Sequence, residues 1–496
     1  MRVSFNMIYG KAVTNMNTRL AEIIRLNEQT SSQQKLTRPS DNPSGMARAL
    51  DLRSTLNQLT QYEENLDTAE GWLTLADDAL RLASDVTTRL KELCEQAATG
   101  TYTAEQRSMI AAEARQLMEE LVGIANTEYA GDSIFAGSKT TGNAYEMGLA
   151  ATVQDPEGAS LVVEAVAGGA DSTIYLEFLD SGEVGTDELR CRYTTDGGST
   201  WQEATLAAGE TVLQCGGVQA TLAAGSTVTA TEEAGSADGT ALWLRPAAIY
   251  QGNTTDAISV LHAGSSATTA TAAGVFSTNV VVRLDADATL PGPLGYAYST
   301  DNGATWSTGH TSTNGTLQLP GGILTLGPDG TALTQGEQFL VQPENGAITL
   351  AIGASTSVQI NNIGKDIFGG LYTPAGAATA QAAEPQDANL LEAVGQLVGY
   401  LESNTLDGIG QCLEVITKAQ AQLTTALGVV GGRETRLEFA RSSVATISDA
   451  VTAALSNIED ADTVQLAVDL AKAEYAYQAV LQSSSSIMKL SLLNYL

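Results

Sequence analysis

The chain has 496 residues and carries 57 acidic side chains against 25 basic ones, so its formal net charge at pH 7 is −32. A chain of this length exceeds a single hydrophobic core, and two to four domains are expected. The negative charge argues against a nucleic-acid backbone or an anionic membrane as partner, and the lack of any run of about 18 apolar residues predicts that no segment spans a membrane.

The chain opens with a polar segment instead of a signal peptide. Residues 1–6 lead to Gly10 and Lys11 without an apolar stretch, so no cleaved signal is expected, and taken alone this favours a cytoplasmic protein. A first helix is predicted here, because apolar residues recur at spacings of three and four and mark one face. These residues are Phe5, Ile8, Ala12, Met16, Leu20 and Ile23.

The clearest period in the chain predicts one long helix from about Pro43 to Thr99. Leucine recurs at every seventh residue from Leu52 to Leu80, and the same register continues to Cys94. Asn42 is the expected N-cap, and proline suits the first helical position. At 1.5 Å per residue such a helix is roughly 80 Å long, so it is a rod and not a globular element.

Composition changes after a shorter predicted helix at about Ala104–Ala125. Residues 141–383 are rich in Gly, Thr, Ser and Ala, with short β-branched runs between turn signals. Their net charge is −19, compared with −5 for residues 1–140 and −8 for residues 384–496. The middle of the chain is therefore predicted to be an acidic all-β insertion between two helical arms.

The insertion contains an internal repeat at an offset of 105 residues. The segment from Tyr193 to Trp201 matches the segment from Tyr298 to Trp306, which predicts two tandem β domains at about 160–260 and 265–360. In each, Asp-Gly or Asn-Gly would supply the positive φ of a tight turn, with a tryptophan packed beneath. The structural turn residues are Asp196, Gly198, Trp201, Asp301, Gly303 and Trp306.

The strand-like pairs Ile134–Phe135 and Ile367–Phe368 are expected to bound the insertion on the side of the rod opposite the chain ends. The insertion should therefore project outward. Its charge suits an exposed surface better than a subunit interface.

The second helical arm has the same kind of pattern as the first. Apolar positions alternate by four and three from Ile409 to Val430 and continue at a seven-residue spacing to Ile458, although Gly431–Gly432 weakens the helix. The segment Ile458–Asp462 separates this helix from a final one. The coiled-coil seam of that last helix is Leu466, Leu470, Ala473, Tyr477, Val480, Ser484 and Ile487.

The predicted fold is multidomain α plus β, with a long coiled-coil or helical-bundle rod built from both termini and an inserted all-β region of two tandem repeats. The terminal stripes can pair with each other or with neighbouring chains. Because lone helices with one apolar stripe are marginal in water, the arms are expected to stay largely disordered until they are covered. The expected domains are terminal arms at 1–42 and 463–496, a rod with a β-hairpin at 43–140 and 384–462, and the insertion at 141–383.

The repeated turn resembles the Asp-box hairpin of sialidases and other β-propellers. That motif specifies a turn and is a poor sign of catalysis, and a propeller needs about four or more blades where this chain shows two copies. The insertion has four arginines, Arg190, Arg192, Arg245 and Arg283, and they form no recognisable constellation for a sugar carboxylate. No catalytic residue is predicted, and the protein is not expected to be an enzyme.

Cysteine and histidine are too few for a disulfide framework or a zinc site. The chain has four cysteines and two histidines, His262 and His310, so neither a metal nor a cofactor is expected. Cys94 falls on the heptad seam and is predicted to be a buried apolar residue. Cys191 and Cys215 flank a predicted hairpin and could pair in an oxidising setting, although free thiols are the favoured expectation.

Several segments of the arms resemble the flagellin superfamily, and within it the hook–filament junction proteins. They cover about half of the chain. They are Met1–Ser4, Lys35–Pro43 followed by Ala47–Leu50, Ala125–Thr127 with Ile134–Gly137, Tyr250–Asn253, Ile363–Gly370, and Ile458–Asp462 continuing to the Asn-Tyr-Leu ending at Leu496.

The resemblance implies a structural assembly protein of the bacterial flagellum, located outside the cell and exported by the flagellar type III apparatus without a cleaved signal. This replaces the cytoplasmic expectation. It implies assembly through the terminal helices into a ring of identical subunits, with hook-associated protein 1, flagellin and an export chaperone as partners. Filament flagellin is the nearer alternative, and a secreted carbohydrate-active or carbohydrate-binding protein is the distant one. The insertion is no part of the family pattern.

Overall fold

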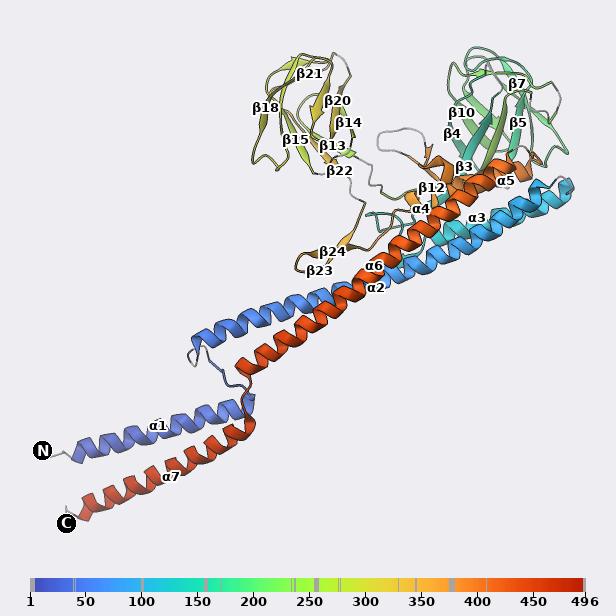
Figure 1. The fold of residues 1–496 in the computed structure, drawn as a ribbon. Coiled ribbons are helices and arrows are strands. Elements are labelled where there is room, and N and C mark those ends of the chain that lie inside the picture. The colour runs from blue at the N-terminus through green and yellow to red at the C-terminus, as the bar shows by residue number, and fades with distance from the viewer. Residues whose placement is uncertain are drawn as a thin grey trace. The chain divides into compact units, whose positions relative to one another are not determined.

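The chain separates into two compact units in the computed structural model. One contains the residues up to Asp67, the segment Ala351–Ser357 and the residues from Leu437 onward, and the other contains Thr68–Leu350 and Val358–Arg436. Figure 1 shows the elements of each. The structure describes residues 5–493 except 39, 41, 100–101, 156–158, 171, 233, 236–237, 254–257, 275, 277, 329, 344–345, 374–379 and 407.

Long helices form both ends of the chain, as predicted. Their bounds are α1 (Phe5–Ser32), α2 (Pro43–Ala98), α3 (Ala104–Ala125), α5 (Leu390–Glu402), α6 (Ile409–Glu459) and α7 (Thr463–Leu493). The expected bounds of the rod helix and of the third helix are confirmed to within a residue. α6 continues without a break through Gly431–Gly432, because the packing of its apolar stripe outweighs the low helix propensity of glycine.

The helix starts are set by side-chain caps. The backbone N–H of Gly45 donates to Asn42 Oδ1 at 3.0 Å, so Asn42 caps α2 as predicted. Thr103 and Gln106 form a reciprocal capping box at the start of α3. Asp462 Oδ1 accepts from the backbone N–H groups of Val464 and Gln465 at the start of α7.

The heptad positions of α2 form a buried seam. Leu66, Leu73, Leu80 and Cys94 are each at most 1% exposed, and the alanines three residues further on are equally covered. Opposing apolar residues of α6 are buried as well, including Ile416 and Leu423 in one unit and Leu437 and Val444 in the other. Within each unit the apolar stripes of both helices are therefore buried, as expected for helices with one apolar face.

The first β repeat is a sandwich with one core between two sheets. One sheet has the order β12-β5-β7-β8, and β3 pairs with β12. The facing sheet has the order β4-β10-β9. A small separate pair is formed by β6 and β11. Its strands are β3 (Tyr145–Gln154), β4 (Val163–Gly168), β5 (Ile174–Phe178), β6 (Gly182–Glu183), β7 (Leu189–Thr194), β8 (Gln202–Leu206), β9 (Val212–Cys215), β10 (Val218–Leu222), β11 (Thr227–Val228) and β12 (Ala241–Tyr250).

The second repeat has the same strand order around a core of its own. The sheet β13-β22-β15-β17-β18 faces β14-β20-β19, and β16 pairs with β21. The strands are β13 (Ile258–Ala263), β14 (Thr269–Gly274), β15 (Val280–Leu284), β16 (Ala288–Thr289), β17 (Leu294–Ser299), β18 (Ser307–Ser312), β19 (Thr316–Leu319), β20 (Gly322–Gly327), β21 (Ala332–Leu333) and β22 (Gln338–Pro343). The shared topology agrees with the tandem repeat read from the sequence.

Short elements complete the chain, and two of them differ from expectation. Ile367–Phe368 is the end of the short helix α4 (Gly364–Phe368), and Ile134–Phe135 lies outside any strand, so both strand assignments are wrong. The reason is aromatic packing, since the rings of Phe135 and Phe368 meet edge to face with centroids 5.1 Å apart. The remaining pairs are β1 (Glu128–Tyr129) with β2 (Asp132–Ser133), β23 (Thr349–Gly353) with β24 (Thr356–Gln359), and β25 (Leu371–Tyr372) with β26 (Gln381–Ala382).

The outer face of the first repeat is covered by α5 and the turn after it. Trp243 of β12 is 1% exposed, packs against the ring of Tyr400 at 5.4 Å, and donates from its indole nitrogen to Ser403 Oγ at 2.9 Å. Glu402 accepts from Arg115 of α3 and from the backbone of Thr173. The first repeat is thus fastened to the helices by apolar contact and by charge.

Candidate assembly surface

The two ends of the chain meet as a pair of helices. α1 and α7 lie side by side and run in opposite directions (Figure 1). The pair has little fully buried surface among the described side chains, with Leu26 and Gln29 of α1 and Ala473 of α7 each 5–6% exposed. A two-helix pair has no third layer, so most of its apolar side chains remain partly open to solvent.

A short backbone crossing ties this pair together where both helices join the rest of their unit. Gln34 and Asp460 form an isolated antiparallel bridge, and the N–H of Ala461 donates to the carbonyl of Gln33 at 3.0 Å. Gln33 holds a φ of +56°, a left-handed conformation that lets the chain turn out of α1. Residues more than 400 positions apart are therefore joined by main-chain hydrogen bonds.

The predicted stripes lie on the facing sides of the pair. On α1, Ala12, Met16 and Ile23 are half-buried, while Leu20 is exposed. On α7, Ala473 is buried and the other described positions are half-buried, namely Leu466, Leu470, Tyr477, Val480 and Ser484. Phe5, Ile8 and Ile487 belong to the helices by their backbone, but their side chains lie outside the described residues.

This placement changes the expectation of disordered arms. Among the described residues the arms are helical, and the seam of α7 has a partner inside its own chain, because α1 supplies a complementary stripe of similar length. Of the two alternatives left open by the sequence, pairing within one chain accounts for the half-buried faces.

A second set of apolar side chains on the same helices is left uncovered. On α7, Val464 and Tyr475 are 73% and 76% exposed, and Val468 is also exposed. With Ala471 between them these residues are spaced by four, three and four, so they form a second apolar seam. The sequence prediction missed this seam, although its spacing was present in the sequence, because the first seam alone was taken as the interacting face.

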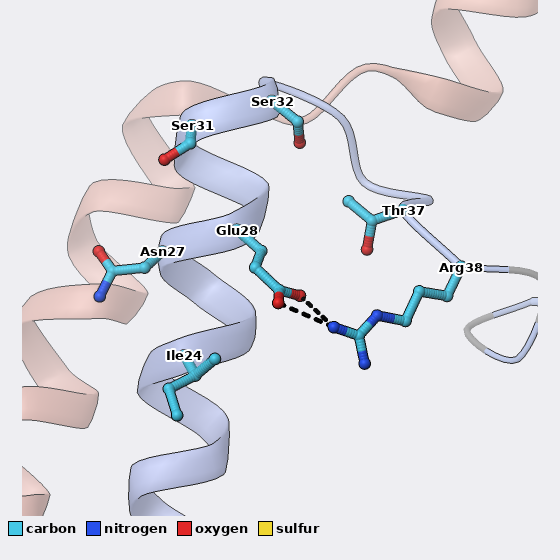
Figure 2. A pocket seen from close by; sticks show the side chains of 7 residues that line it. All are labelled: Ile24, Asn27, Glu28, Ser31, Ser32, Thr37 and Arg38. Carbon is cyan, nitrogen blue, oxygen red and sulfur yellow. Dashed lines mark hydrogen bonds and ion pairs between the residues drawn. The ribbon is translucent and has the colours of Figure 1, made fainter.

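Exposed apolar residues also occur on α1, where Met7 is 69% exposed and Ile24 is 51% exposed. Ile24 lines a hollow that runs from the end of α1 to the loop after it (Figure 2). Glu28 and Arg38 face each other across this hollow and are joined by hydrogen bonds of 2.8 and 2.9 Å. The other lining residues are Asn27, Ser31, Ser32 and Thr37. An apolar side chain in a polar rim is the usual composition of a contact surface between proteins.

The repeated turns of the insertion are held by their aspartates. Asp196 accepts from the backbone and the hydroxyl of Thr200 at 2.8 and 2.6 Å, and Asp301 accepts from Thr305 at the same distances. These hydrogen bonds lower the pKa of Asp196, and they lower the pKa of Asp301 to about 2.

The glycines of the same turns have positive φ, with Gly198 at +89° and Gly303 at +91°. Trp201 and Trp306 are half-buried, and each lies against an arginine, Arg192 at 5.3 Å and Arg283 at 4.4 Å from the ring centroid. Each aspartate accepts hydrogen bonds within its own turn and each tryptophan lies against an arginine, so these residues stabilise the turns.

Other kinds of site have no support among the described residues. None of their helices is long and apolar enough to cross a membrane. No group of three or more His, Cys, Asp or Glu side chains in the described part of the chain could hold a metal ion. All four cysteines are buried free thiols, and burial raises the pKa of Cys94 above its usual range and that of Cys412 to about 12.

Both ends of the chain match known protein regions. Residues 3–140 match the bacterial flagellin N-terminal helical region, and residues 413–496 match the bacterial flagellin C-terminal helical region. The chain is 31% identical over 144 residues to flagellar hook-associated protein 3 of Salmonella typhimurium, an alignment covering 28% of this chain and 44% of that protein. It is 29% identical over 140 residues to a flagellin of Clostridium tyrobutyricum, covering 28% of this chain and 37% of that one. The chain thus spans less than half the length of the curated relatives it matches.

Similar solved structures include the flagellar hook-associated protein 3 of Legionella pneumophila, with 15% identity and a TM-score of 0.31. That alignment covers 82% of this chain and 98% of that one. A putative flagellar hook-associated protein of Vibrio parahaemolyticus aligns with 10% identity and a TM-score of 0.39, over 85% of this chain and 100% of that one.

Proposed function

Since the chain belongs to the flagellin superfamily, whose N-terminal and C-terminal helical regions it carries, we propose that it is the structural adaptor at the hook–filament junction of a bacterial flagellum. Subunits would assemble as a ring through their terminal helices, with hook-associated protein 1 on one side and flagellin on the other. An export chaperone would hold the chain before assembly.

The observation that carries this proposal is the second apolar seam of α7. Val464, Val468 and Tyr475 are exposed on a helix whose other face is already covered by α1. Exposed aromatic and aliphatic side chains in register along a helix are stabilised when a further helix covers them. The pair α1–α7 is therefore a preassembled unit with a face left for neighbouring subunits.

Each part of the chain would have its own role in the assembly. The arms at 1–42 and 463–496 would make the subunit contacts, and the helices at 43–140 and 384–462 would form the supporting rod. The insertion at 141–383 would lie outside the contacts between subunits. Its net charge of −19 favours solvent over an interface between identical chains, since like charges repel.

Several features favour the junction role over filament flagellin. The Pro39-Ser40-Asp41-Asn42-Pro43 loop and the Asn-Tyr-Leu ending both resemble the junction proteins more than flagellins. No catalytic role is proposed for any residue, because the Asp-box-like aspartates are committed to their turns.

Locating the protein on isolated flagella by immunogold electron microscopy tests the role. We expect label in one narrow zone between hook and filament. Label along the whole filament would identify a flagellin instead, and label away from flagella would support a secreted protein with another task. A second test uses variants in cells. Tyr475→Asp should prevent filament attachment. The control is Lys472→Asp, which changes a similarly exposed residue of the same helix and should leave attachment intact.

A further inference from the structure

Two buried cysteines of the first repeat lie on opposite sheets of its sandwich. Cys191 is on β7 and Cys215 is at the end of β9, and the two strands belong to different sheets. Both side chains are in the same hydrophobic core cluster, with exposed fractions of 0% and 2%. The Cys191 thiol donates to the carbonyl of Ala204 at 3.3 Å, and the Cys215 thiol together with burial raises the pKa of Cys191.

The second repeat shows what occupies the equivalent place. Strands β7 and β17 correspond at the repeat offset, so Cys191 corresponds to Tyr296. The hairpins β9–β10 and β19–β20 correspond through their turns, so Cys215 corresponds to Leu319, which pairs with Gly322 as Cys215 pairs with Val218.

In the second repeat, Tyr296 joins the two sheets by hydrogen bonds. The hydroxyl of Tyr296 donates to the carbonyl of Gln318 and accepts from the N–H of the same residue, both at 2.9 Å. Tyr296 lies on β17 and Gln318 on β19, so the bond crosses from one sheet to the other. The first repeat has no hydroxyl at that position and has a pair of thiols instead.

We propose that Cys191 and Cys215 form a disulfide that joins the two sheets of the first repeat and closes while the repeat folds. In the reaction, one cysteine thiolate attacks a small-molecule disulfide and releases one thiol. The second cysteine then attacks the mixed disulfide and releases the other thiol. Two S–H groups lose two protons and two electrons in total, and the small-molecule disulfide is reduced to two thiols.

Burial decides when this reaction takes place. A thiol in an apolar core is protonated and out of reach of an oxidant, so the folded repeat reacts slowly in either direction. Closure accompanies folding, while the two strands approach each other and the oxidant still has access. Once closed, the bond restricts the unfolded chain between the two cysteines and stabilises the repeat. The pair is a property of the repeat and is independent of the assembly role proposed above.

The test uses the full chain, unfolded in urea with a reductant and then refolded either with the reductant or with a mixture of reduced and oxidised glutathione. Free thiols are blocked with iodoacetamide in denaturant, and a non-reducing digest is analysed by mass spectrometry. We expect the glutathione sample to contain a peptide pair joined between Cys191 and Cys215, about 2 Da lighter than the sum of its reduced peptides. The first repeat of this sample should also unfold at a higher urea concentration than that of the sample refolded in reductant, as measured by hydrogen exchange of residues 174–244.

Matched variants separate the cross-link from general effects on folding. Cys94→Ala with Cys412→Ala leaves a single pair and should still give the joined peptides and the higher midpoint. Cys191→Ala with Cys215→Ala should show the same midpoint under both refolding conditions. The proposal is overturned if both thiols of the wild-type chain are alkylated after oxidative refolding, if Cys191 is found joined to a different partner, or if the joined form has the lower midpoint.

Discussion

The guanidinium of Arg53 donates to the carboxylate of Glu459 at 2.8 Å, so the first part of α2 is held to the last residue of α6. The Glu459 side chain is 8% exposed, whereas that of Arg53 is 46% exposed. The backbone of Glu459 also takes part in the crossing that joins α1 to α7, since its carbonyl accepts from the N–H of Lys35. One buried carboxylate therefore lies at the meeting point of four helices of this unit.

The ion pair gives a first prediction about stability. Arg53→Ala leaves the nearly buried carboxylate of Glu459 without its partner. We expect the unfolding free energy of this unit to fall by about 1–2 kcal/mol. The loss should be smaller than for a fully buried ion pair, because Arg53 is partly exposed. Urea unfolding followed by helix circular dichroism measures it. Arg19→Ala, which breaks an exposed pair with Glu22, is the control and should change stability by under about 0.5 kcal/mol. Equal losses in the two variants would contradict this account.

The terminal helix pair is expected to open more often than the helices of the other unit. Amides of residues 5–32 and 463–493 should exchange faster than those of residues 68–98 and 104–125, because the pair buries few side chains completely while the α2 seam is closed. Hydrogen exchange of the purified monomer measures this difference. Protection at the ends equal to that of α2 would mean that the pair is stable without neighbours.

The two seams of α7 are expected to respond differently to a charge. Leu470→Asp places a carboxylate on the side facing α1 and should disrupt the pair, which circular dichroism and hydrogen exchange of residues 5–32 would detect. Tyr475→Asp lies on the exposed seam and should leave the pair intact. Both should block filament attachment in cells. Normal filaments with Tyr475→Asp would remove the exposed seam from the interface.

The second repeat should lose stability in acid. Burial would raise the pKa of Glu337, but hydrogen bonds from Ser266, Thr334 and His262 outweigh burial and lower that pKa to about 2. Because the folded state then binds fewer protons than the unfolded state, the stabilisation is present above the ordinary glutamate pKa and is lost as the pH falls from about 4.5 towards 2.

Hydrogen exchange of residues 258–343 at a series of pH values tests this dependence. Glu337→Gln should flatten it in that window. Glu232→Gln is the control, since Glu232 is an exposed glutamate of the first repeat. A pH dependence in Glu337→Gln as steep as in the unmodified chain would assign the effect to other carboxylates, of which Asp301 is the first to examine.

The insertion should tolerate deletion unevenly. Removing residues 253–345, which joins Gly252 to Gly346, takes out one complete sandwich with its own core, and the remaining chain should fold and assemble. Removing residues 150–350 also takes away Trp243, which packs against Tyr400 of α5, and Arg245, which pairs with Glu392 of α5. We therefore expect exposed apolar surface and aggregation. Light scattering and circular dichroism of both variants measure the difference. Equal solubility would show that α5 does not need the first repeat.

Local patterns in the sequence determined the helices and the repeat. The seven-residue leucine spacing in α2, its cap at Asn42 and the 105-residue offset of the two β domains each depend on residues close in sequence or on direct self-similarity, so they could be read without a structure. The α1 and α7 stripes could also be seen, because a helix face follows from spacing alone.

What the sequence could not decide was which surface covers which. The stripe of α7 lies against α1 of the same chain, Phe368 at the end of a short helix packs on Phe135, and α5 covers the outer sheet of the first β repeat. These outcomes depend on contacts between residues far apart in the chain. The contacts are stabilised by burial of apolar surface, which cannot be predicted from the spacing of residues within one segment. Cys191 and Cys215 are closer in the chain, 24 positions apart, and they share one core because two sheets close on it.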